Sequence, residues 1–188
     1  MVSKERNEEL LQDIPWLPWE GLAIVYYLYM GSMEGKEITA LIHNHQVEKW
    51  HVSLEELHKR AKENTPKLCP STICRLDRHL LGLEEEDDLA DNGFPILYIL
   101  SNKNIVNGAT CMLYDAVIKN FADKLNSDLI ILPSSIHEVL LLKDDDSVKL
   151  EMLREMVRSI NMESVPAEDI LSDDPYFYSR EEDWIRVA

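Results

Sequence analysis

The residues of this chain that could do chemistry gather between two apolar runs. Residues 129–132 and 139–142 have the length and composition of buried strands. Between them lies Pro-Ser-Ser-Ile-His-Glu at 133–138, which holds two hydroxyls, an imidazole and a carboxylate. A hydroxyl beside an imidazole that a carboxylate orients is the arrangement of a nucleophilic hydrolase. The candidate catalytic residues of a serine hydrolase are therefore Ser134, Ser135 and His137.

The alternation of side chains along a strand argues against such a hydrolase. Side chains two apart share a face, so Ser135 and His137 lie together while Glu138 points to the opposite face. Glu138 therefore does not orient the imidazole, and no sequence signal identifies another acid for that role. The chain also lacks the Gly-x-Ser-x-Gly motif of a nucleophile elbow. We favour a structural interpretation, in which both serines satisfy backbone groups at a turn and His137 hydrogen-bonds beside the core.

A second polar loop follows the predicted strand at 96–100. It ends in the turn pair Asn107-Gly108. Loops at the ends of neighbouring strands often carry binding residues, so this loop and segment 133–138 form the expected ligand or partner site. Its residues are Asn102, Lys103, Asn107, Ser134, Ser135, His137 and Glu138. The chain has no glycine-rich phosphate loop or dinucleotide fingerprint, and we expect no cofactor.

The histidines and cysteines do not predict a metal site. His43 and His45 would share a face of a strand, but a stable zinc site needs three or four ligands at recognised spacings. We interpret both as polar residues of an edge strand. Cys69 and Cys74 lack a second cysteine pair, and an odd total of three cysteines is typical of a reduced, cytoplasmic setting.

Acidic residues dominate the charge of the chain, because 35 acidic side chains against 19 basic ones give a net charge of −16. Nucleic-acid backbones bind through Lys and Arg, so direct nucleic-acid binding is disfavoured. An acid excess confers solubility, or it docks on a basic partner. The second interpretation makes one run of charges the candidate partner-binding surface. That run is Glu84, Glu85, Glu86, Asp87 and Asp88.

Neither a membrane span nor a secretory signal is predicted. No apolar run approaches the roughly 20 residues that a spanning helix needs. The first nine residues have no apolar core of the kind found in a signal peptide. We therefore expect a cytoplasmic protein that does not bind membranes.

Apolar periodicity and turn residues predict an α+β fold, with an antiparallel or mixed sheet and helices packed mainly on one face. Residues 1–16 form an N-terminal arm, and residues 17–188 form a single domain. Its first part, 17–92, is a hairpin followed by two helices, and its second part, 93–188, has the order ββαββα and a tail. The predicted strands are 22–29, 38–42, 96–100, 109–113, 129–132 and 136–142, and the predicted helices are 54–63, 71–83, 115–125 and 150–160.

Several segments together resemble a bacterial family of domains of unknown function. The most specific is Ile-Leu-Pro-Ser-Ser-Ile-His-Glu-Val at 131–139, which contains the signature L-P-S-S-I-H-E-V. The others are residues 22–26, 64–66, 97–103, 107–108, 112–114 and 165–172. The resemblance covers residues 17–180 and implies a single natural module. It implies no activity, substrate or cofactor.

The acid excess and the lack of an assembled catalytic set predict a non-enzymatic protein-binding or regulatory module with a basic partner. One concrete form is an inhibitor of a basic nucleic-acid-handling protein, such as an anti-defence protein encoded by a mobile element. The alternatives are the serine hydrolase of Ser134 or Ser135 with His137, and a small-ligand sensor at the two polar loops. Exposed edge strands and four tryptophans permit a homodimer but do not demand one.

Overall fold

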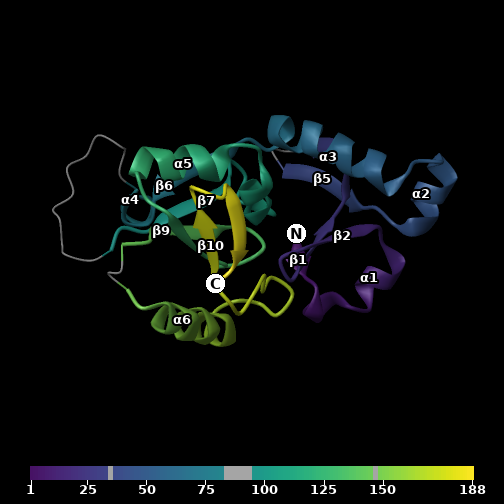
Figure 1. The fold of residues 1–188 in the computed structure, drawn as a ribbon. Coiled ribbons are helices and arrows are strands. Elements are labelled where there is room, and N and C mark those ends of the chain that lie inside the picture. Colours follow the sequence, from purple (N-terminus) through teal and green to yellow (C-terminus); the bar gives the residue numbers. More distant parts are fainter. Residues whose placement is uncertain (34–35, 83–94, 146–147) are drawn as a thin grey trace. The chain divides into compact units, whose positions relative to one another are not determined.

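The computed structural model describes residues 1–33, 36–82, 95–145 and 148–188 (Figure 1). The described chain forms two compact units, Met1–Leu68 and Cys69–Ala188. Both contain helices and antiparallel strands, so the predicted α+β class is confirmed. No helix in the described ranges is long and apolar enough to cross a membrane.

The first residues of the chain are packed into the N-terminal unit. β1 (Val2–Ser3) pairs antiparallel with β3 (Leu22–Val25), and β3 pairs with β2 (Trp16–Trp19). Between β1 and β2 lie the 3-10 turn η1 (Glu5–Asn7) and the short helix α1 (Leu10–Asp13). Leu11 and Ile14 are buried with Val2 and Ala23 in one apolar cluster. The expected arm at 1–16 is thus a strand, a turn and a helix, because its apolar residues have a core to join.

The predicted hairpin is present, with its first strand displaced. β4 (Tyr27–Met33) pairs antiparallel with β5 (Lys36–Leu41) as a separate two-stranded sheet, with a bulge between Tyr29 and Gly31. The apolar run expected as one strand at 22–29 divides at Tyr26 into β3 and β4. Tyr26 is buried, and its hydroxyl lies 3.0 Å from Nδ1 of His58, so this residue turns inward at the division.

Two helices complete the N-terminal unit: α2 (Asn44–Trp50) and α3 (Leu54–Leu68). The expected edge-strand placement of His43 and His45 is wrong, because His43 caps α2 and His45 lies in its first turn. Ser53 caps the start of α3, since the amide of Glu56 donates to Oγ of Ser53 at 3.1 Å. The helix continues past residue 63 to Leu68, with Pro66, which has no N–H to donate to the preceding turn, in its last turn.

The C-terminal unit is built on a six-stranded antiparallel sheet. Its strand order is β11-β10-β8-β9-β7-β6. The strands are β6 (Ser71–Arg75), β7 (Tyr98–Asn102), β8 (Leu129–Leu132), β9 (Val139–Lys143), β10 (Tyr176–Ser179) and β11 (Trp184–Val187). Every residue of β8 is buried, and β8 and β9 pair in register from Leu129 opposite Lys143 to Leu132 opposite Leu140. The two apolar runs of the sequence therefore form the centre of this sheet.

Two predicted elements of this unit are of the wrong type. The helix expected at 71–83 is an edge strand, β6, followed by the short helix α4 (Leu76–Leu81). The returning strand expected at 109–113 is the 3-10 helix η2 (Gly108–Leu113), which packs against β7. Cys111 of η2 is fully buried, and this burial raises the pKa of its thiol to about 11. The apolar residues of η2 are thus core residues of a helix rather than of a strand.

Helices cover both faces of the six-stranded sheet. Phe121 of α5 (Val117–Leu125) packs edge-on against Tyr98, whose register partner is Leu141. Leu153 and Val157 of α6 (Leu150–Glu163) pack in a cluster with the neighbouring strand residue Leu142. Successive strand residues point to opposite faces, so α5 and α6 lie on opposite sides (Figure 1). We expected helices mainly on one face of the sheet. Helices pack on both faces because the central strands carry apolar side chains on both, and each face must be buried.

Candidate functional site

The segment between β8 and β9 is a tight corner at the edge of the C-terminal core. The amide of Ser135 donates to the carbonyl of Glu138 at 3.1 Å, which closes the turn on itself. Two further backbone hydrogen bonds link Ile136 to distant segments. The amide of Ile136 donates to the carbonyl of Asp169 at 2.8 Å, and the carbonyl of Ile136 accepts the amide of Ala109 at 3.2 Å. The corner is therefore held by three parts of the chain.

Both ring nitrogens of His137 have partners. Nδ1 accepts the backbone N–H of Asn107 at 3.2 Å, and Nε2 lies 3.5 Å from Oδ1 of Asp169. A nitrogen that accepts carries no proton, so in the neutral ring the proton is on Nε2 and faces the Asp169 carboxylate. The imidazole thus joins the loop before Gly108 to the segment that carries Asp169.

Asp169 is the site residue that the sequence argument missed. We expected no identifiable acid behind His137, and this carboxylate comes from 32 positions further along the chain. Its segment, 165–172, is one of those that carry the family resemblance. That resemblance was the signal that could have singled it out, because no local periodicity brings residues 137 and 169 together.

The serine hydroxyls make the contacts of a local turn. Oγ of Ser135 accepts the N–H of His137 itself at 3.1 Å, and Oγ of Ser134 donates to Oε1 of Glu138 at 3.4 Å. A serine nucleophile needs a ring nitrogen that is free to take its proton. Here Nδ1 holds the Asn107 amide and Nε2 faces an acid, so the corner gathers the predicted residues without assembling that relay.

The loop 102–108 is folded around the side chain of Asn102. Its Oδ1 accepts the amides of Asn104 and Val106, at 3.0 and 3.4 Å, and its Nδ2 donates to the carbonyl of Val106 at 2.7 Å. Ser101, at the end of β7, donates from Oγ to the carbonyl of His137 at 2.8 Å. The side-chain amide of Asn102 therefore holds the loop in its conformation, while the side chain of Lys103 is exposed beside it.

The predicted acidic surface and the histidines near residue 44 are two other groups of candidates from the sequence. The acidic run at 84–88 lies outside the described residues. The rings of His43 and His45 lie 5.7 Å apart at the start of α2. Across residues 1–33, 36–82, 95–145 and 148–188, no three His, Cys, Asp or Glu side chains form a group that could hold a metal ion.

The imidazole of His137 is expected to brace the corner, because it links Asn107 to Asp169. His137→Ala should lower the free energy of unfolding of the C-terminal unit by about 2 kcal/mol, since it removes the acceptor of the Asn107 amide and the partner of Asp169. His137→Asn should recover about half of that loss, because an asparagine Oδ1 can stand near the position of Nδ1. Hydrogen exchange of the β7 amides measures both. Unchanged protection in His137→Ala would contradict the brace.

Known proteins supply a family but no activity. A family model described as "Family of unknown function (DUF5688)" matches residues 1–180 of the chain. The match confirms the resemblance seen in the sequence and extends it to the first residue. No curated protein and no solved structure matches the chain.

Proposed function

The chain belongs to this family of unknown function, and we propose that it is a non-enzymatic, acidic module that binds a basic protein. In its most concrete form it inhibits a basic protein that handles nucleic acid, as an anti-defence protein of a mobile element would. Carboxylates on its surface would then occupy the cationic groove that otherwise holds phosphates.

The observation that carries this proposal is the charge of the C-terminal unit. Residues Cys69–Ala188 hold 24 of the 35 acidic side chains and 11 of the 19 basic ones. Six of those basic residues already pair with acids of the same unit. They are Arg75, Lys119, Arg154, Arg158, Arg180 and Arg186. The remaining acids give this unit a negative field that attracts and orients a basic partner.

The hydrolase alternative is supported by one contact, the Asp169 carboxylate beside His137. The same contact serves a brace equally well, since the other ring nitrogen already accepts the Asn107 amide. A serine-reactive fluorophosphonate separates the two functions. The binding module predicts no labelling of Ser134 or Ser135 in the folded chain, whereas a hydrolase predicts labelling that disappears in both His137→Ala and His137→Asn.

A salt-series pull-down tests the binding function. The full chain, immobilised on beads, should capture basic nucleic-acid-binding proteins from a bacterial lysate at low salt and release them as the salt concentration rises. Beads that carry polyglutamate at equal charge control for simple ion exchange. Added DNA should compete with the chain for a captured partner. Capture of nothing beyond the polyglutamate control at low salt would refute the proposal.

A further inference from the structure

α6 presents four different rows of side chains along its 14 residues. Residues four apart on a helix lie one above the other, so each row runs along the axis. The buried row is Leu153, Val157 and Asn161; the arginine row is Leu150, Arg154, Arg158 and Met162; the glutamate row is Glu151, Glu155, Ser159 and Glu163; the methionine row is Met152, Met156 and Ile160. The methionine row lies between the buried row and the glutamate row.

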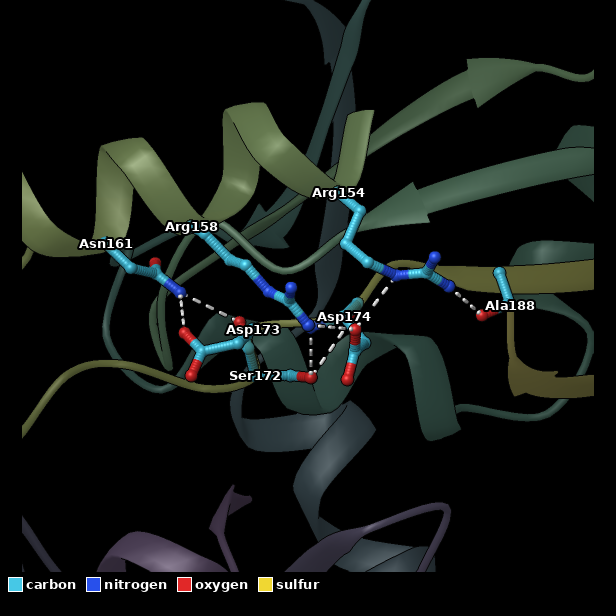
Figure 2. A network of polar contacts seen from close by, with 7 residues as sticks. All are labelled: Arg154, Arg158, Asn161, Ser172, Asp173, Asp174 and Ala188. Atoms are coloured by element: carbon cyan, nitrogen blue, oxygen red, sulfur yellow. Dashed lines mark hydrogen bonds and ion pairs between the residues drawn. The ribbon is translucent and has the colours of Figure 1, made fainter. Parts of the chain in front are cut away.

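The rotation of α6 about its axis is fixed by two of these rows (Figure 2). Leu153 and Val157 of the buried row pack on the sheet. On the arginine row, Arg154 and Arg158 both pair with Oδ1 of Asp174, at 3.0 and 3.1 Å. Arg154 also donates to the carbonyl of Ala188 at 2.7 Å. The arginine side of the helix therefore faces the chain around β10 and β11.

The opposite flank of the helix is apolar and exposed. Met152, Met156 and Ile160 are 60%, 38% and 42% exposed. Three apolar side chains in one continuous row differ from apolar residues scattered singly over a surface, which need no explanation. Methionine is flexible and polarisable, and it suits surfaces that adapt to the partner they bind.

Carboxylates line the solvent side of this apolar row. Glu151, Glu155 and Glu163 are exposed and stand in the next row of the same helix. The two arginines of the helix lie beyond the glutamate row and pair with Asp174 rather than with these glutamates. An apolar row with an acidic margin is complementary to a segment that is apolar on one side and cationic along its edge.

We propose that this flank of α6 is the docking surface for a basic amphipathic helix of the partner. The partner's apolar side chains cover Met152, Met156 and Ile160, and its Lys or Arg side chains reach Glu151 and Glu155. This assignment rests on the proposed function and names the surface that performs it. The acid excess disfavours other occupants, because the negative charge of a second copy or of an anionic lipid surface would be repelled by the glutamate row.

A fluorescent helical peptide of leucine and lysine, about 18 residues long, is a suitable probe for this surface. Fluorescence anisotropy with the full chain at low salt should show binding that Met152→Gln with Met156→Gln weakens about tenfold. Glutamine matches methionine in length and helix propensity, so the helix is retained. Met162→Gln is the matched control: Met162 is 87% exposed on the same helix but lies in the arginine row. Its affinity should be unchanged.

Two further measurements test the apolar and the acidic parts of the surface separately. A peptide of the same composition with its amphipathic order scrambled should bind more weakly, and Glu151→Gln with Glu155→Gln should reduce both the affinity and its salt dependence. Equal binding of the scrambled peptide, or equal loss in Met162→Gln, would overturn the assignment. A homodimer that the parent chain forms and the Met152→Gln, Met156→Gln chain does not would also overturn the assignment, because a second copy would then occupy the surface.

The pull-down separates this inference from the function on which it rests. A basic partner captured as well by the Met152→Gln, Met156→Gln chain as by the parent would overturn the α6 surface and leave the binding function intact. Failure of the parent chain to capture any partner would refute the function itself.

Discussion

A Gly108→Ala chain is expected to lose about 3 kcal/mol of the free energy of unfolding of its C-terminal unit. A Cβ at position 108 would overlap Oγ of Ser101 and the carbonyl oxygen of His137, and would lie 2.8 Å from the backbone nitrogen of Asn102. Two of these three atoms are backbone, so a rotamer change cannot relieve the overlap. The added carbon must push β7 away from the corner that β8 and β9 enclose.

Gly82→Ala is the matched control for this substitution. Gly82 ends α4 in the left-handed region at φ 65°, and no atom of the described residues lies within 4 Å of the place where a Cβ would stand. Its replacement should cost about 1 kcal/mol through backbone strain alone. Native-state hydrogen exchange of the β7 amides compares the two variants. A Gly108→Ala chain as stable as Gly82→Ala would mean that the three segments do not meet as closely as described.

The centre of the C-terminal unit is the part of the fold that the sequence predicts best. Residues 129–132 form a strand with the predicted bounds, and the predicted strand at 136–142 becomes β9, Val139–Lys143. Apolar runs of this length have no satisfactory position other than a sheet interior, so their type and burial follow from composition. The corner between them is likewise predicted, because serine and proline interrupt the runs.

The two misassigned segments show where local pattern fails. Ile73, Leu76 and Leu80 have helical spacing, yet Ile73 lies in β6 while Leu76 and Leu80 belong to α4. The periodicity arose by coincidence across a boundary between two elements. At 109–113 the local pattern is short and apolar, and such runs do not distinguish a strand from a buried helical turn. In both segments the tertiary position decides, through pairing with β7 in one and packing against β7 in the other.

The candidate site was predicted as a set of residues but not as a set of contacts. The structure brings Asn107 to His137, and Ser134 to Glu138, within the two loops expected to be neighbours. Asp169 and Ser101, which also hold His137, could not be assigned, because their contacts depend on how distant segments cross. The role of the imidazole follows only from those crossings. With Asn107 on one nitrogen and Asp169 on the other, the ring has no nitrogen left to take a proton from a serine hydroxyl.

Asn161→Asp should destabilise the C-terminal unit by about 3 kcal/mol near neutral pH. Asn161 is buried in the last turn of α6, and its Nδ2 donates to the carbonyl of Ser172 at 2.9 Å and to Oδ1 of Asp173 at 2.8 Å (Figure 2). The substitution keeps the shape but replaces the donor with a charged acceptor that faces two acceptors. Urea unfolding followed by circular dichroism measures the loss, with the exposed Arg158→Gln as a control that should cost less than 1 kcal/mol.

The pH dependence of this variant has a definite sign. Burial beside Asp173 should raise the folded-state pKa of the introduced carboxyl above its unfolded value of about 3.9. The deficit relative to the parent is then small below that pH, where the carboxyl is protonated in both states, and it grows as the pH rises. A deficit that stayed constant between acidic and neutral pH would show that the side chain reaches solvent.

A double substitution tests whether the contact between Asn161 and Asp173 is the cause. Asn161→Asp with Asp173→Asn exchanges donor and acceptor across the 2.8 Å contact, so one of the two hydrogen bonds re-forms and the paired carboxylates are removed. The double variant should be about 1 kcal/mol more stable than the sum of the single losses predicts. Additive losses would assign the cost to burial of the charge alone. Because Asn161 lies in the buried row of α6, this contact also helps to set the rotation of the helix at which Met152 and Met156 are exposed.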